Sequence, residues 1–138
     1  MAVIIVDASV LLALVLRERH AETVSGMFER WQRDGSPLHA PMLAQYEVAS
    51  ALTRARVRDL LSADDAREAL EVIAALGLTF HPPTDGARIV EVAVDLKRHS
   101  AYDAAYLALA EHLSAEVWTL DGPLARNAST RYRARLIA

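Results

Sequence analysis

The sequence contains no cysteine, which excludes disulfide bonds, zinc–thiolate centres and cysteine nucleophiles. This composition suits a cytoplasmic protein. No apolar run is long enough to cross a bilayer, and no positively charged residues precede the first apolar run. We therefore expect neither a membrane span nor a signal peptide. The five histidines are scattered and no His-Glu-x-x-His motif occurs, which argues against a zinc hydrolase.

Excess positive charge is also missing, because the formal net charge is -3. A protein held to nucleic acid by electrostatics alone is strongly basic, so any such contact must be local. Nearly all basic residues are arginine, and they cluster at 54–58 and 126–135. A solvated helix face explains such clusters as well as phosphate binding does. The candidate phosphate contacts are Arg54, Arg56, Arg58 and Arg126.

The rest of the composition is that of one globular domain spanning residues 1–138, with 53% hydrophobic and 24% charged residues. Short apolar segments alternate with helical patterns along the chain. The expected strands are 3–6, 38–40, 78–81, 117–120 and 135–137, and the expected helices are 10–16, 20–33, 41–56, 62–76, 84–96, 100–109 and 122–127. The alternation predicts a three-layer α/β fold with a mainly parallel central sheet of four to five strands.

Four acidic residues stand in apolar surroundings. Asp7 and Asp121 each follow an apolar strand, and Glu47 and Asp103 are isolated acids within apolar helices. Burying a carboxylate is costly unless a positive group neutralises it, and the neighbouring positions on the helix of Glu47 supply none. We therefore expect the partner of Glu47 to come from another part of the fold.

Each acid also has an ordinary explanation. Asp7 and Asp121 could cap the helices that follow them, Asp103 could form a capping box with Ser100, and Glu47 could pair with an arginine such as Arg54. Capping does not account for Glu47, however. One shared cause explains all four acids, namely a divalent cation bound by carboxylates that would otherwise repel one another. Oxygen ligands of this kind favour Mg²⁺ or Mn²⁺, which can support phosphodiester hydrolysis.

Four segments of the sequence, in this order, resemble the PIN-domain ribonucleases, and within them the VapC-type toxins of bacterial toxin–antitoxin pairs. The resemblance covers essentially the whole chain. The segments are Val6-Asp7-Ala8-Ser9, the run from Tyr46 to Leu52, the run from Tyr102 to Glu111, and the run from Thr119 to Ala125.

The resemblance implies a parallel sheet at which Asp7, Glu47, Asp103 and Asp121 meet in one acidic pocket that binds Mg²⁺ or Mn²⁺ and cleaves single-stranded or loop RNA. It also implies a cognate antitoxin as partner, and a homodimer. Two hydroxyl residues, Ser9 and Thr119, match family positions that orient metal-bound water or a carboxylate. The alternatives are that Ser9 caps a helix and that Thr119 is an ordinary residue of a strand. Hydrolysis by activated water predicts products with 5′-phosphate and 3′-hydroxyl ends.

Two other classes of protein stay open at this point. An aspartate-nucleophile phosphatase would use Asp7 as phosphoryl acceptor, but such enzymes carry Asp-x-Asp where this chain has Asp7-Ala8-Ser9. A PIN-like module could instead bind RNA or protein without cutting. The four retained acids argue against a pure binder, because mutually repelling carboxylates contribute little to binding alone.

Overall fold

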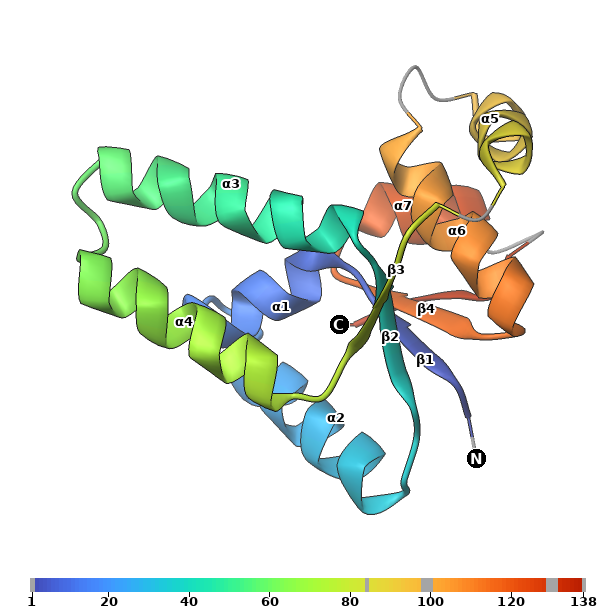
Figure 1. The fold of residues 1–138 in the computed structure, drawn as a ribbon. Coiled ribbons are helices and arrows are strands. Elements are labelled where there is room, and N and C mark those ends of the chain that lie inside the picture. The colour runs from blue at the N-terminus through green and yellow to red at the C-terminus, as the bar shows by residue number, and fades with distance from the viewer. Residues whose placement is uncertain (1, 84, 98–100, 129–131, 138) are drawn as a thin grey trace.

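The computed structural model describes residues 2–83, 85–97, 101–128 and 132–137, and helices and strands alternate through this part of the chain (Figure 1). The strands are β1 (Ile4–Val6), β2 (Leu38–Pro41), β3 (Thr79–His81), β4 (Glu116–Thr119) and β5 (Ala134–Leu136). The helices are α1 (Ala8–Val15), α2 (Ala21–Arg33), α3 (Leu43–Val57), α4 (Ala63–Ala75), α5 (Gly86–Asp95), α6 (Tyr102–Leu113) and α7 (Gly122–Ala128).

The sheet has the order β3-β2-β1-β4-β5, and every pairing in the described ranges is parallel. The central strand β1 is buried on both faces, since Ile4, Ile5 and Val6 are at most 2% exposed. This burial explains why β1 shows no polar alternation in the sequence. The predicted parallel α/β sheet is confirmed.

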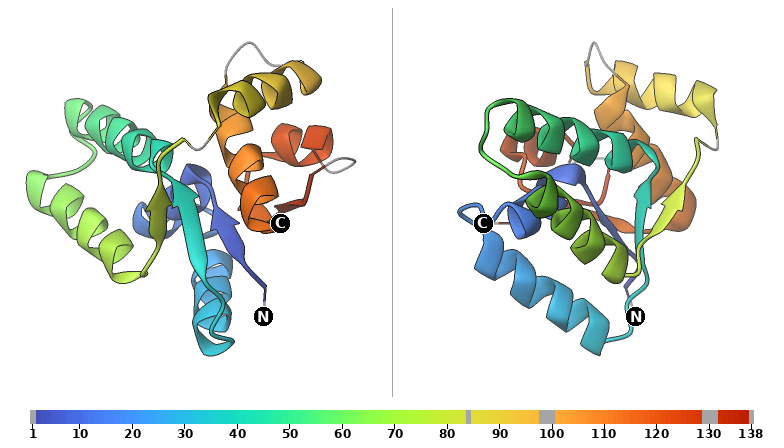
Figure 2. Two further views of the ribbon diagram at one scale, coloured as in Figure 1. Left: turned by 45° about the vertical axis from the view of Figure 1, so that its right-hand side comes forward. Right: turned by 60° about the vertical axis from the view of Figure 1, so that its left-hand side comes forward.

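The helices form a layer on each side of the sheet (Figures 1 and 2). Helices α1 to α4 lie on one side, where Leu11 and Phe28 belong to the core, and α5 to α7 lie on the other, where Leu107 and Leu124 are buried. The three-layer architecture is therefore confirmed. In the described residues, no helix has both the length and the hydropathy that crossing a bilayer requires.

Most predicted boundaries lie within two residues of those observed. Pro41 lies within this margin but belongs to the other element, because it ends β2 instead of beginning α3. A proline is tolerated at a strand end because its missing N–H is not needed there, and the next residue, Met42, donates its backbone N–H to the His81 carbonyl at 2.7 Å. The helix starts predicted at Thr84 and Ser100 lie outside the described residues.

The strand order places a topological switch between β1 and β4. From β1 the chain proceeds to β2 and β3 on one side, whereas β4 and β5 lie on the other side. In sheets of this kind the connections diverge at the carboxyl ends of the central strands and leave a crevice where ligands bind. Asp7 follows β1 and Asp121 lies two residues beyond β4, so both acids lie at this crevice.

Candidate active site

Asp7 is a buried carboxylate held by three hydrogen bonds. It follows β1 and caps α1, where its Oδ1 accepts the backbone N–H of Val10 at 3.2 Å. The Ser9 hydroxyl also donates to Oδ1, and the Thr119 hydroxyl donates to Oδ2, each at 2.5 Å. The residue is only 7% exposed. Helix capping is therefore real, but it accounts for one oxygen of the two.

The two hydroxyls also tie Asp7 to the segment that follows β4. Ser9 Oγ accepts the backbone N–H of Leu120 at 3.0 Å, and Thr119 Oγ1 accepts that of Asp121 at 2.9 Å. Each hydroxyl thus accepts a bond from the backbone and directs its own proton to the carboxylate. This arrangement fixes the plane of the Asp7 carboxylate.

Burial raises the pKa of Asp7 to about 6, and desolvation is the main cause. The nearby charge of Glu47 raises it further, whereas the bonds from Ser9, Thr119 and Val10 lower it. Asp7 is thus ionised at neutral pH but takes up a proton readily in mild acid. Strongly shifted carboxylates in a crevice are typical of functional sites.

Glu47 is brought to the same crevice by α3. It is half-buried, and its Oε1 accepts the hydroxyl of Tyr106, on α6, at 2.6 Å. Desolvation raises the pKa of Glu47, the Tyr106 bond lowers it, and the charge of Asp103 raises it. The partner does come from another element, as expected, but it is a neutral tyrosine and not an arginine.

The other two acids lie at helix starts on either side. Asp103 is half-buried in the first turn of α6, close enough to Glu47 for the two charges to interact. Asp121 is half-buried before α7 and accepts the backbone N–H of Leu124 at 3.0 Å. Asp121 therefore caps its helix as the ordinary explanation proposed. The capping box of Asp103 with Ser100 lies outside the described residues.

The donor set suits a hard divalent cation, because it consists of carboxylate oxygens, and a neighbouring acid contributes to the raised pKa of Asp7 and of Glu47. The fit is incomplete as the side chains stand: in the described ranges no three residues among His, Cys, Asp and Glu are close enough together to coordinate one ion. A bound ion would require the carboxylates to turn inward or to bind partly through water, which is common for Mg²⁺.

The candidate phosphate-binding arginines do not gather at the acids. Arg54, Arg56 and Arg58 are exposed at the carboxyl end of α3, and Arg54 lies seven residues or about 10 Å along the helix from Glu47. Seven residues are close to two helical turns, so Arg54 lies on the same side of α3 as Glu47. The Arg126 guanidinium lies over Gly122, the residue after Asp121, and so reaches the edge of the crevice.

Sequence reasoning did not assign a role to Tyr106. The residue is 3% exposed, and its hydroxyl pKa is raised by burial and by the nearby Glu47. One signal for it was available, because Tyr106 follows Asp103 by three residues and therefore shares its helix face. We assign Tyr106 a positioning role, since it holds Glu47 and does not itself need to contact substrate.

Replacing Tyr106 with Phe is expected to move the acid limb of the pH–rate profile to higher pH. The bond from Tyr106 lowers the pKa of Glu47, so its loss raises that pKa and leaves less Glu47 ionised at a given pH. Stability should fall by about 1 kcal/mol. Rates of RNA cleavage measured across pH test this, with Tyr132→Phe as a matched hydroxyl deletion. An unchanged profile in Tyr106→Phe would contradict the positioning role.

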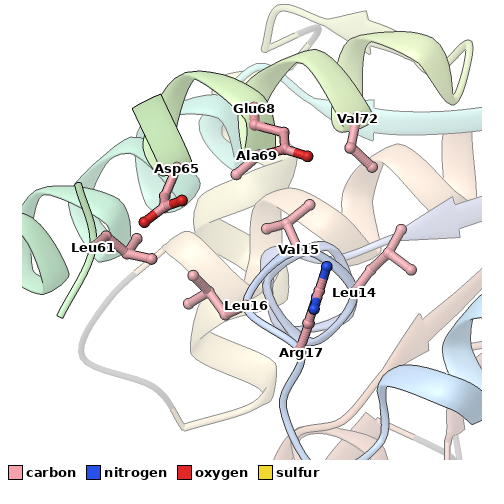
Figure 3. Close-up of a pocket in the computed structure, with 9 residues that line it drawn as sticks. All are labelled: Leu14, Val15, Leu16, Arg17, Leu61, Asp65, Glu68, Ala69 and Val72. Atoms are coloured by element: carbon pink, nitrogen blue, oxygen red, sulfur yellow. The ribbon is translucent and has the colours of Figure 1, made fainter. Parts of the chain in front are cut away.

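A separate hollow of about 430 Å³ lies between α1 and α4 and contains none of the four acids (Figure 3). Leu14, Leu16 and Val72 give its lining apolar surface, Asp65 and Glu68 on α4 add two negative charges, and Arg17 adds one positive charge. The lining of the hollow therefore combines apolar surface with charges of both signs.

Comparison with known proteins identifies a family and several relatives. The family described as PIN domain matches residues 4–129. Ribonuclease VapC9 of Mycobacterium tuberculosis is 40% identical over 119 residues, covering 86% of this chain and 85% of that protein. Ribonuclease VapC3 of Pyrobaculum aerophilum is 36% identical over 125 residues, covering 88% and 92%.

The fold also matches a solved structure, that of PAE2754 from Pyrobaculum aerophilum. The TM-score is 0.71 at 22% sequence identity, and the match covers 91% of this chain and 79% of the other. The structural likeness supports the three-layer fold, and the family match spans all four acids. The chain belongs to the PIN domain family.

Proposed function

We propose that this protein is a metal-dependent endoribonuclease, the toxin of a toxin–antitoxin pair, and that residues 1–138 form a single PIN domain. One observation carries the proposal: a buried carboxylate, Asp7, is oriented through both oxygens and interacts electrostatically with Glu47, which interacts with Asp103. The relatives described as VapC ribonucleases support the same reaction class.

Asp7, Glu47, Asp103 and Asp121 are the proposed catalytic acids. They supply oxygen ligands for Mg²⁺ or Mn²⁺, which when bound would activate water and stabilise the leaving 3′ oxygen. Ser9 and Thr119 keep the Asp7 carboxylate in one orientation, and Tyr106 does the same for Glu47. The arginines at 54–58, which are exposed, and Arg126 are the proposed contacts to the RNA backbone beyond the acids.

The geometry weighs against the aspartate-nucleophile alternative. A phosphoryl acceptor needs an accessible oxygen in line with phosphorus, whereas both Asp7 oxygens accept hydrogen bonds and the side chain is 7% exposed. The same carboxylate is well suited to bind a cation through a remaining lone pair.

Cleavage of single-stranded RNA in the presence of Mn²⁺ tests the proposal. The products should carry 5′-phosphate and 3′-hydroxyl ends, because water and not the ribose 2′-OH attacks phosphorus. A 2′,3′-cyclic phosphate product would contradict this mechanism. RNA binding without any cleavage would instead favour the non-cleaving module.

The proposal includes a cognate antitoxin, a homodimer and a cytoplasmic location. The hollow between α1 and α4, whose lining combines apolar side chains with Asp65, Glu68 and Arg17, is the proposed contact for a segment of the antitoxin. Helix α5 exposes Val90 and Val94, one turn apart, as an apolar strip for contact between two copies. Co-purification with the neighbouring gene product and sedimentation of the isolated protein check the two contacts separately.

A further inference from the structure

The aromatic side chains of this protein divide sharply by exposure. The sequence has eight, and the structure describes all of them. Only Tyr46 and Tyr102 are exposed, at 74% and 63%. The buried or half-buried ones are Phe28, Trp31, Phe80, Tyr106, Trp118 and Tyr132. Exposing two large aromatic rings is unfavourable in water, so their location is informative.

Each exposed tyrosine is the chain neighbour of a proposed catalytic acid. Tyr46 precedes Glu47 near the start of α3, and Tyr102 precedes Asp103 at the start of α6. Tyr106, one turn after Tyr102 on the same side of α6, bonds to Glu47. The bond joins the two helices at this point, and the beginning of α3 lies beside α6 (Figure 1). The two exposed tyrosines therefore lie next in the chain to two acids, on the two helices that this bond joins.

The acids alone provide poor contacts for an RNA strand. Carboxylates repel phosphates, and a bound cation would offset this charge without contacting the bases. Aromatic rings supply the missing interaction, because bases of any sequence stack on them when the strand is unpaired. Exposed tyrosines at the edge of the acids are suited to this role, whereas exposed tyrosines elsewhere would not be.

We propose that Tyr46 and Tyr102 stack on unpaired bases on either side of the phosphodiester bound at the acids, and so contribute base contacts to the single-stranded RNA that the resemblance implies as substrate. This inference rests on the proposed ribonuclease function. It adds to that function two residues that bind the bases, while the arginines bind the sugar–phosphate backbone.

Two ligands separate stacking from charge: a short oligo(U) strand, and a strand of the same length and backbone that lacks bases. Binding is measured in the Asp7→Asn background, where hydrolysis is expected to be blocked. Tyr46→Ala and Tyr102→Ala should each weaken oligo(U) binding about tenfold and leave binding of the abasic strand unchanged. Tyr46→Phe and Tyr102→Phe retain a ring and should bind oligo(U) like their background.

Leu70→Ala is the control, because Leu70 is a large apolar side chain, 48% exposed on α4, a helix that carries none of the proposed catalytic acids or candidate phosphate-binding arginines. This control should not alter either affinity. The inference is wrong if the tyrosine variants lose affinity equally for both strands or keep full affinity for oligo(U). It is also wrong if the alanine variants dissociate a dimer in sedimentation while oligo(U) binding per protomer stays unchanged.

The outcome for stacking is separable from the outcome for catalysis. If the protein with Asp7 intact does not cleave RNA in Mn²⁺ but the tyrosine variants lose base-dependent binding, the hydrolysis proposal fails and the stacking inference stands. If cleavage occurs and both alanine variants bind oligo(U) as tightly as their background, the hydrolysis proposal stands and the stacking inference fails.

Discussion

Asp7→Asn is expected to abolish RNA cleavage while the protein remains folded. Asparagine has nearly the same shape, so it can still accept the Val10 N–H and stay between Ser9 and Thr119. It lacks the negative charge that a divalent cation requires. The loss of several kcal/mol of transition-state stabilisation corresponds to at least about a thousandfold in rate. Cleavage of a labelled single-stranded RNA in Mn²⁺ measures the effect.

The same substitution should change stability in a pH-dependent way. The pKa of Asp7 is about 6 in the folded protein against an ordinary 3.8, so the folded state binds more protons between these values. Stability therefore falls as pH rises through this window, by about 3 kcal/mol. Asparagine avoids the cost of a buried charge but accepts fewer hydrogen bonds. We expect Asp7→Asn to be about 1 to 2 kcal/mol more stable than the parent at about pH 8, and to lose this advantage near pH 4.

Glu71→Gln is the matched control for Asp7→Asn, since Glu71 is an exposed acid on α4. It should neither alter the cleavage rate nor shift the pH dependence of unfolding in urea. Parental cleavage by Asp7→Asn would remove Asp7 from the site. A stability difference that does not vary with pH would contradict the link between burial of Asp7 and its raised pKa.

Sequence patterns were sufficient to predict the helices and strands but not the order of the strands in the sheet. The uninterrupted apolar run of β1 predicted a strand buried on both faces, and Ile4 to Val6 are buried in this way. The order β3-β2-β1-β4-β5 depends on pairing between segments more than a hundred residues apart, such as Ile4 with Glu116. Local periodicity carries no information about such pairing.

The acids could be singled out because a charge in an apolar segment is unusual, but their hydrogen bonds could not be foreseen. The Thr119 hydroxyl reaches Asp7 across 112 positions of sequence. From the rule that a buried carboxylate needs a positive partner, we expected a positive group beside Glu47, whereas its partner is the Tyr106 hydroxyl. Glu47 is only half-buried, so a tyrosine hydroxyl suffices as its partner, and the remaining cost is visible as its raised pKa.

Removing divalent cations is expected to abolish cleavage, and adding Mn²⁺ or Mg²⁺ should both restore it and raise the melting temperature. The buried Asp7 and the raised pKa values of Asp7 and Glu47 show that negative charge at the site destabilises the fold. A bound cation offsets that repulsion, and at a hundred times its dissociation constant it contributes about 2.7 kcal/mol. Chelation followed by thermal unfolding with and without Mn²⁺ measures this stabilisation.

The stabilisation by Mn²⁺ should itself depend on pH and on Asp7. Metal ligands must be deprotonated, so the rise in melting temperature should diminish as pH falls below about 6, where Asp7 takes up its proton. Asp7→Asn should lose the rise at any pH, while Glu71→Gln should keep it. An equal rise in the parent and in Asp7→Asn would place the bound cation elsewhere. Undiminished cleavage after chelation would remove the metal from the reaction but leave RNA hydrolysis intact, because the two measurements are independent.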